Sequence, residues 1–182
     1  MARCSIFVAL GAAWVAMLVV VGAYAGWVFV AVKSASVTAV AEPSLKGVAP
    51  DILARWVGGQ VTRSPFSVAG IVSFVAPALL AALLAGARGG PRITWQISLC
   101  AGALVVAIIS HAQGVQLELA SDAFWAALGG GKADAIVNAQ AALSTSHARA
   151  QILFVTLIAF AVATTVAGAA HLTRRASLAS AA

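Results

Sequence analysis

The sequence predicts an all-α integral membrane protein with four transmembrane helices. Four long segments contain no Asp, Glu, Lys or Arg, namely 4–32, 64–87, 93–117 and 150–173. Each is longer than the roughly 20 apolar residues that a helix needs to cross a bilayer. The composition agrees, because 62% of the residues are hydrophobic and only 9% are charged, against about 25% charged in soluble domains.

The apolar segments are expected to be helices, because a backbone in hydrocarbon must pair its N–H and C=O groups within its own segment or within a closed barrel. The segments show no alternation of the kind a barrel strand has. About 180 residues leave no room for a second domain once four spans are counted. We therefore expect a single membrane domain over residues 1–182, whose predicted parts are spans near 6–32, 65–87, 93–115 and 150–172, outer loops 33–64 and 116–149, and a tail at 173–182.

The first span lies close to the N-terminus and resembles a secretory signal in one respect. Ala39 and Ala41 before Glu42 form a small-x-small pattern of the kind that signal peptidases cleave. The apolar run is about twice the roughly 7 to 15 residues of a signal peptide's apolar region, and only Arg3 supplies positive charge ahead of it. We expect the first span to be retained.

The segment before the second span predicts an amphipathic helix. From Pro50 to Val61, apolar residues recur at helical spacing beside charged and polar ones, which is typical of a helix lying on the membrane surface. Trp56 would then lie at the depth of the headgroups. Pro77, in the middle of the second span, is expected to bend that helix because it removes one backbone hydrogen bond.

The third and fourth spans are expected to continue into a helical hairpin that projects outward. Ser121 is a candidate cap for a short helical continuation after the third span. The triple glycine 129–131 predicts a sharp break. Residues 132–166 contain neither Gly nor Pro, so the fourth helix is expected to begin well outside the membrane and run straight into it.

Small residues at four-residue spacing predict close helix contacts. Gly22 and Gly26 form such a pair in the first span, and Ala159, Ala163 and Ala167 form a row in the fourth. We expect these faces to pack within the bundle, with contact between subunits as the alternative.

The distribution of basic residues predicts the orientation. One side of the membrane carries basic residues in very short segments without any acid, namely Arg3, Arg88, Arg92, Arg174 and Arg175. The opposite side spreads six basic residues over two longer loops that also contain all five acids. The positive-inside rule therefore places both termini in the cytoplasm, in the plasma (inner) membrane of a bacterium. We interpret Trp56, Arg88, Arg92, Arg174 and Arg175 as membrane-interface anchors, and the positive net charge as attraction to lipid headgroups rather than to nucleic acid.

Two histidines form the one suggestive pair of ligand-type residues. His111 lies about 19 residues before the hairpin turn and His147 about 16 after it, so at about 1.5 Å per residue both fall at similar heights on antiparallel helices. Two neutral imidazoles at one level can ligate a haem iron or, with a third group, a metal ion. The alternative is that both histidines simply reach headgroups or water near the interface.

Two segments are similar to a known group of proteins. The segment Asp51 to Phe66 and the segment Ala133 to Arg149 resemble an uncharacterised group of small four-span bacterial membrane proteins, a domain of unknown function related to a eukaryotic transmembrane protein linked to drug tolerance. Together they cover about a third of the chain. The resemblance implies the four-span architecture and little chemistry.

The sequence favours a non-catalytic role. It contains no phosphate-binding Gly-Lys-Ser/Thr loop, no Cys-x-x-Cys, no His-Glu-x-x-His and no Gly-x-Ser-x-Gly. No acid or base other than histidine lies inside the spans, whereas proton-coupled carriers depend on such residues. We expect an accessory or scaffold subunit without cofactor, whose partners are the bilayer and other membrane subunits or copies of itself. A haem- or metal-binding protein (a small oxygenase or electron-transfer component) that uses His111 and His147 is the alternative, and an oligomeric pore or carrier is the weaker one.

Overall fold

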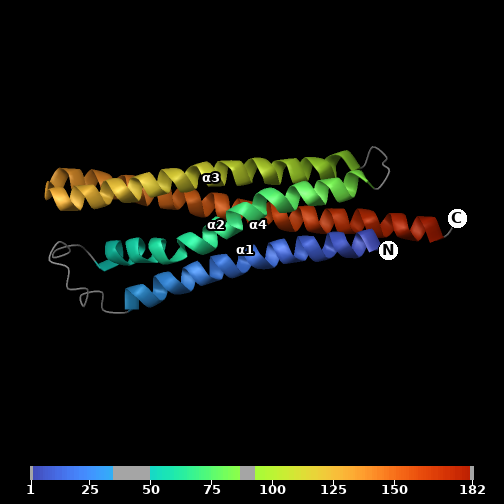
Figure 1. The fold of residues 1–182 in the computed structure, drawn as a ribbon, viewed down its shortest axis with the longest axis horizontal. Coiled ribbons are helices and arrows are strands. Elements are labelled where there is room, and N and C mark those ends of the chain that lie inside the picture. The colour runs from blue at the N-terminus through green and yellow to red at the C-terminus, as the bar shows by residue number, and fades with distance from the viewer. Residues whose placement is uncertain (1, 35–49, 87–92, 181–182) are drawn as a thin grey trace. The chain divides into compact units, whose positions relative to one another are not determined.

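The computed structural model describes residues 2–34, 50–86 and 93–180 and contains four helices in that part of the chain (Figure 1). They are α1 (Ala2–Ser34), α2 (Pro50–Ala85), α3 (Ile93–Gly130) and α4 (Ala133–Ser180). The described residues contain no strand. The all-α prediction is therefore confirmed.

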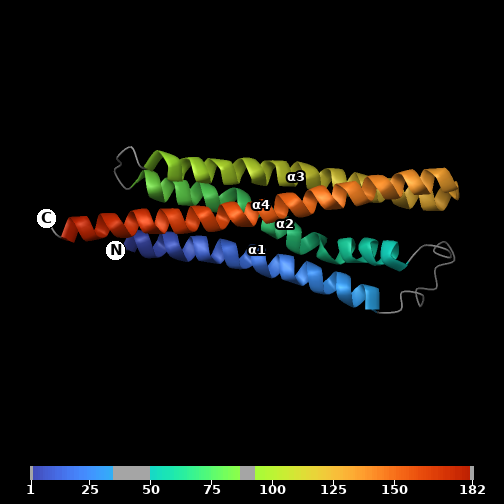
Figure 2. The same cartoon turned by 180° about the vertical axis from the view of Figure 1, so that it is seen from behind.

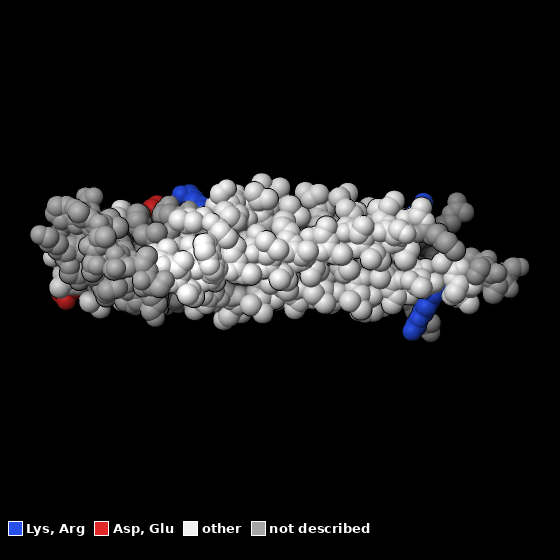
Figure 3. Space-filling view, turned by 90° about the horizontal axis from the view of Figure 1, so that it is seen from below, with Lys and Arg blue, Asp and Glu red and all other residues white. Residues whose placement is uncertain are grey.

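All four helices are long and apolar enough to cross a membrane, which makes this a multi-pass membrane protein. The candidate spans are Ala2–Val32, Val61–Ala85, Trp95–Gly130 and Ala133–Leu178. The face drawn in Figure 3 carries its blue and red side chains toward the ends of the helices, with an uncharged stretch along their middle. An uncharged band of this kind is what a helix bundle needs to contact hydrocarbon.

Helix α2 begins at the predicted surface segment and continues without a break through the second span. Pro50 is its first residue, where its missing N–H costs nothing because the first N–H groups of a helix have no intrahelical partner. The predicted amphipathic segment is thus the first part of a 36-residue helix rather than a separate element. The side chains of residues 51–57, which include Trp56, lie outside the described ones, and so do Arg88 and Arg92 and the side chain of Arg175.

The described helices divide into two units by their contacts. Unit 1 comprises Met1–Val19, Val68–Ser110 and Leu153–Ala182, and unit 2 comprises Val20–Ser67 and His111–Ile152. Every helix contributes one part to each unit. Each unit is described below by itself.

Unit 1 is a bundle whose helices α1 and α4 approach closely at glycines, and Figures 1 and 2 both show these two helices side by side there. A methyl group built on Gly168 would lie 2.1 Å from Cζ of Phe7, and one built on Gly11 would lie within the Thr165 side chain. Gly102 of α3 meets the ring of Phe160 of α4 in the same way. Small residues let two backbones approach in a medium where no hydrophobic effect drives helices together.

Unit 2 contains a hairpin of α3 and α4 that turns at Gly131. This glycine has a φ of +67°, a left-handed conformation that glycine adopts without steric cost, and its N–H donates to the carbonyl of Leu128 at 3.3 Å. The side chain of Gln113 on α3 donates through Nε2 to the carbonyl of Ser146 on α4 at 3.4 Å. Ser121 lies inside the continuous helix α3 and caps no new helix.

Candidate functional site

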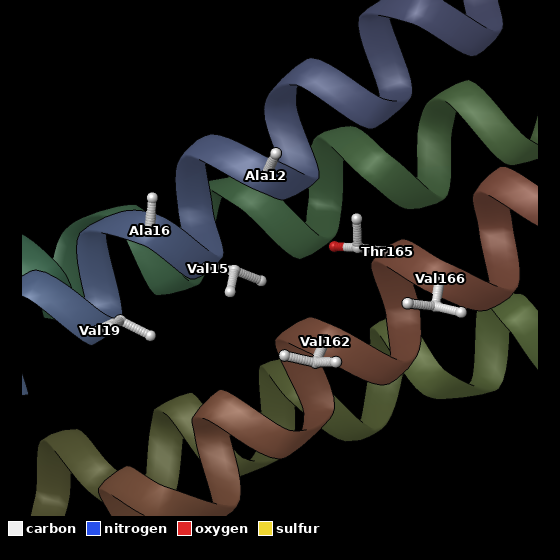
Figure 4. A pocket seen from close by; sticks show the side chains of 7 residues that line it. All are labelled: Ala12, Val15, Ala16, Val19, Val162, Thr165 and Val166. Carbon is white, nitrogen blue, oxygen red and sulfur yellow. The ribbon is translucent and has the colours of Figure 1, made fainter.

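Unit 1 carries an apolar groove between α1 and α4 with a volume of about 360 Å³. Figure 4 shows that its lining side chains come from both α1 and α4. Its lining residues are Ala12, Val15, Ala16, Val19, Val162, Thr165 and Val166. Gly11, one residue before the groove begins on α1, lies against the Thr165 side chain of α4. All of the lining residues except Thr165 have apolar side chains.

The one hydroxyl in this groove is already paired. Thr165 donates through Oγ1 to the carbonyl of Ala161 in its own helix, at 2.7 Å. The proton of this hydroxyl is thus engaged within its own helix, and the oxygen can still accept a hydrogen bond. The groove therefore offers mainly van der Waals contact.

The core of unit 1 contains a buried polar pair. The indole Nε1 of Trp14 on α1 donates to Oγ of Ser73 on α2 at 3.2 Å, and both side chains are buried. Pro77, four residues after Ser73, has no N–H to donate to the Ser73 carbonyl. Pro77 thus lies one helical turn from the hydrogen bond that joins α1 and α2. Between helices in a membrane, such a hydrogen bond stabilises the folded state by about 0.6 kcal/mol on average.

In unit 2, Phe29 joins three helices. A methyl group on Gly58 of α2 would lie 2.5 Å from Cε1 of the Phe29 ring, so the ring rests directly on that glycine. The imidazole of His147 on α4 meets the same ring edge to face, with centroids 6.2 Å apart and planes at 83°. This geometry is the favoured one for two aromatic rings. The sequence did not single out Phe29 or Gly58, because only the fold brings them together.

The pairing of α3 with α4 in the hairpin shows where the predicted ligand residues His111 and His147 lie. The Gln113 to Ser146 bond sets α3 and α4 antiparallel, which places His111 level with Ala148 and hence next to the height of His147. Gln113 faces α4, and two residues correspond to about 200° of rotation around a helix. His111 therefore lies on a face of α3 that points away from α4, and its side chain is exposed. His147 is half-buried against Phe29.

Charged side chains in unit 2 include one ion pair. Arg63 of α2 and Glu118 of α3 approach to 3.0 Å, and both side chains are about half exposed. Exposed pairs of this kind contribute about 0 to 1 kcal/mol. The pair joins two helices just outside their charge-free segments.

The end of unit 1 where α1 begins and α4 ends is basic. Arg3 donates through its guanidinium to the carbonyl of Gly86 at the end of α2, and Arg174 is exposed near the end of α4. The Sγ of Cys4 lies 3.7 Å from Oγ1 of Thr173, and this contact joins the same ends of α1 and α4. Among the predicted anchors, Arg174 is thus exposed at a helix end, as an interface residue would be.

The small residues that the sequence singled out differ in how far they are buried. Gly26, Ala159 and Ala163 are exposed, and a methyl group on Gly26 would meet nothing within 4 Å. Gly22 and Ala167 are half-buried. Contact between subunits through these residues stays a prediction.

No group of three or more His, Cys, Asp and Glu side chains arranged to hold a metal ion occurs among the described residues. Comparisons of the chain with protein-family models, with curated proteins and with solved structures found no match.

Proposed function

We propose that this protein is a non-catalytic accessory or scaffold subunit of a membrane complex, and that the α3–α4 hairpin of unit 2 binds its partner outside the bilayer. The observation that carries the proposal is the length of the two hairpin helices. Helix α3 has 38 residues and α4 has 48, whereas a bilayer crossing takes about 20.

The surplus length is too great to be absorbed by tilt. At about 1.5 Å per residue the 48 residues of α4 extend over about 72 Å, more than twice the roughly 30 Å of the hydrocarbon layer. The part of α4 before the charge-free segment contains Asp134 and Arg149. Charged residues are costly in lipid, which supports a hairpin that stands in water.

The hairpin presents exposed apolar side chains on its surface. Leu119 on α3 is 56% exposed and Val137 on α4 is 64% exposed. The register places Leu119 level with Gln140, one helical turn from Val137. Exposed apolar side chains that gather on a surface outside the bilayer are typical of protein contact sites. In this proposal the termini are cytoplasmic, the membrane is the bacterial inner membrane, and the resemblance to the uncharacterised four-span group extends to the hairpin.

The test is site-specific photo-cross-linking in native membranes. A photoreactive side chain at Val137 is compared with one at Val155, which lies in the same helix, has the same residue type and is 65% exposed but falls inside the charge-free segment. We expect Val137 to give one discrete adduct with a second polypeptide and Val155 to give lipid adducts. Lipid adducts at both positions would contradict the proposal, because the hairpin would then lie in the bilayer.

A haem- or metal-binding role through His111 and His147 is the second candidate. The two histidines lie at similar heights on α3 and α4, which favours this role. Against it, His111 lies on the face of α3 that points away from α4. An absorbance spectrum of the gently extracted protein tests this role. A Soret band that His111→Ala or His147→Ala abolishes would establish it, and a colourless protein from haem-replete membranes would count against it.

A further inference from the structure

The core of unit 1 contains two buried polar side chains that each have an oxygen atom without a hydrogen-bond partner in the described residues. Gln96 on α3 is 5% exposed and Thr164 on α4 is 1% exposed. Within the described part of the chain, neither Oε1 of Gln96 nor Oγ1 of Thr164 has a hydrogen-bond partner. Most buried polar atoms in proteins have one, and each exception calls for an explanation.

Thr164 differs in this respect from four other threonines of the described helices. The hydroxyls of Thr62, Thr145, Thr165 and Thr173 each donate to the carbonyl four residues earlier in their own helix. This is the usual way for a threonine inside a membrane helix to satisfy its hydroxyl. The hydroxyl of Thr164 makes no such bond although its neighbour Thr165 does.

The two unsatisfied atoms lie at nearly the same height. The Phe160 ring of α4 packs on Gly102 of α3. Gln96 lies six residues from Gly102 and Thr164 four residues from Phe160, in the same direction along the antiparallel pair. The difference of two residues corresponds to about 3 Å along the helix axes, within the reach of a glutamine side chain.

Both side chains also belong to the core face of their helices. Gln96 precedes Cys100, Ala103 and Ala107 at spacings of four, seven and eleven residues, and all four are buried. On α4 the buried row is Leu157, Ala161, Thr164 and Gly168. Residues at these spacings share one face of a helix. The amide and the hydroxyl therefore point toward the same interior.

We infer that Gln96 and Thr164 hold an internal water molecule in the core of unit 1. Gln96 Oε1 can only accept a hydrogen bond, so the ligand must donate one, and the Thr164 hydroxyl can donate to the ligand or accept from it. On α4, Thr164 is flanked on the same face by Ala161 and by Gly168, and the Phe7 ring covers Gly168. An uncharged molecule that bonds both ways and is small enough for a packed core is water, which commonly satisfies buried polar groups.

The position of Gln96 gives water a short way in. It is the fourth residue of α3, about 5 Å along the helix axis from Ile93. Trp95 beside it is 53% exposed, as expected of an aromatic residue near a membrane interface. His171 lies on the same face of α4 two turns closer to the chain end. The site is buried but lies near the basic end of unit 1.

The test is water-edited solid-state NMR of the full-length labelled protein in lipid bilayers. We expect polarisation to pass from water to the side chains of Gln96 and Thr164 several-fold faster than to Leu157, which is buried on the same face. The variant Thr164→Val should slow the transfer to Gln96, whereas Thr165→Val should leave it unchanged because that hydroxyl bonds its own helix. Transfer to Gln96 and Thr164 no faster than to Leu157 would overturn the proposal.

Stability provides a second, independent measurement. If water joins the two side chains, Gln96→Leu alone leaves the Thr164 hydroxyl without its bridged partner and should lower the ratio of folded to unfolded protein by about 5- to 30-fold. The double variant Gln96→Leu with Thr164→Val should recover most of that loss. Single variants that both raise stability would contradict the site, because they would show that the two polar atoms are truly unsatisfied in the folded protein.

Discussion

Gly168 is the position at which the packing of unit 1 is tested most sharply. In Gly168→Ala the new methyl group would lie 2.1 Å from Cζ of Phe7, which is about 1.3 Å short of the 3.4 Å at which ordinary contacts begin. Phe7 is 0% exposed, so its ring has no open space into which it can move. Either the ring leaves its preferred rotamer or α1 and α4 separate.

The expected cost follows from the two opposing effects of the methyl group. Overpacking of a well-packed core costs about 1 to 3 kcal/mol, and replacing glycine by alanine in a helix returns about 0.5 to 1 kcal/mol. We therefore expect Gly168→Ala to lower the free energy of unfolding by about 1 to 2 kcal/mol. The assay is the SDS-induced unfolding of the purified protein in mixed micelles.

A matched control separates packing from helix propensity. A methyl group on Gly70 of α2 would meet nothing within 4 Å, so Gly70→Ala should be neutral or stabilising. The double variant Phe7→Leu with Gly168→Ala replaces the ring by a smaller side chain and should regain part of the lost stability. If Gly168→Ala proved as stable as Gly70→Ala, the close approach of α1 and α4 at this glycine would be refuted.

Three further predictions concern single contacts. Gly58→Ala should lower the free energy of unfolding by about 1 kcal/mol, because the methyl group would meet an aromatic ring at 2.5 Å. The adjacent Gly59→Ala should leave it unchanged, because a methyl group there would meet nothing within 4 Å. SDS unfolding of both variants compares them. Gly131→Ala should cost about 1 kcal/mol, because its φ of +67° strains any residue with a Cβ, and hydrogen exchange at the hairpin tip should rise. In a double-mutant cycle of Trp14→Phe and Ser73→Ala, the coupling should be about 0.6 kcal/mol, and a coupling of zero would show that their hydrogen bond contributes nothing.

The sequence was sufficient to predict the spans, because the absence of charge over more than 20 residues is a local property. It also predicted the turn at the triple glycine, where Gly131 takes the left-handed conformation. The surface segment at Pro50 was expected to be a separate helix. The segment is helical, as the first part of α2, and its place at the membrane surface stays a prediction.

The helix contacts were less predictable from the sequence. Four-residue spacing singled out Gly26 and Ala163, which are exposed, whereas the close contacts use Gly11, Gly102 and Gly168. Each of these glycines lies opposite a bulky side chain of another helix, and such a pairing depends on register between segments far apart in the chain. The polar atoms of Gln96 were not predicted for the same reason.

Gentle detergent extraction of the tagged native protein, followed by measurement of the mass of the intact particle and by mass spectrometry of its components, tests the central claim most directly. We expect a particle considerably heavier than the 18.2 kDa chain, with a second membrane protein present in fixed stoichiometry. A stable monomer without a second polypeptide would contradict the proposal that this protein is an accessory subunit.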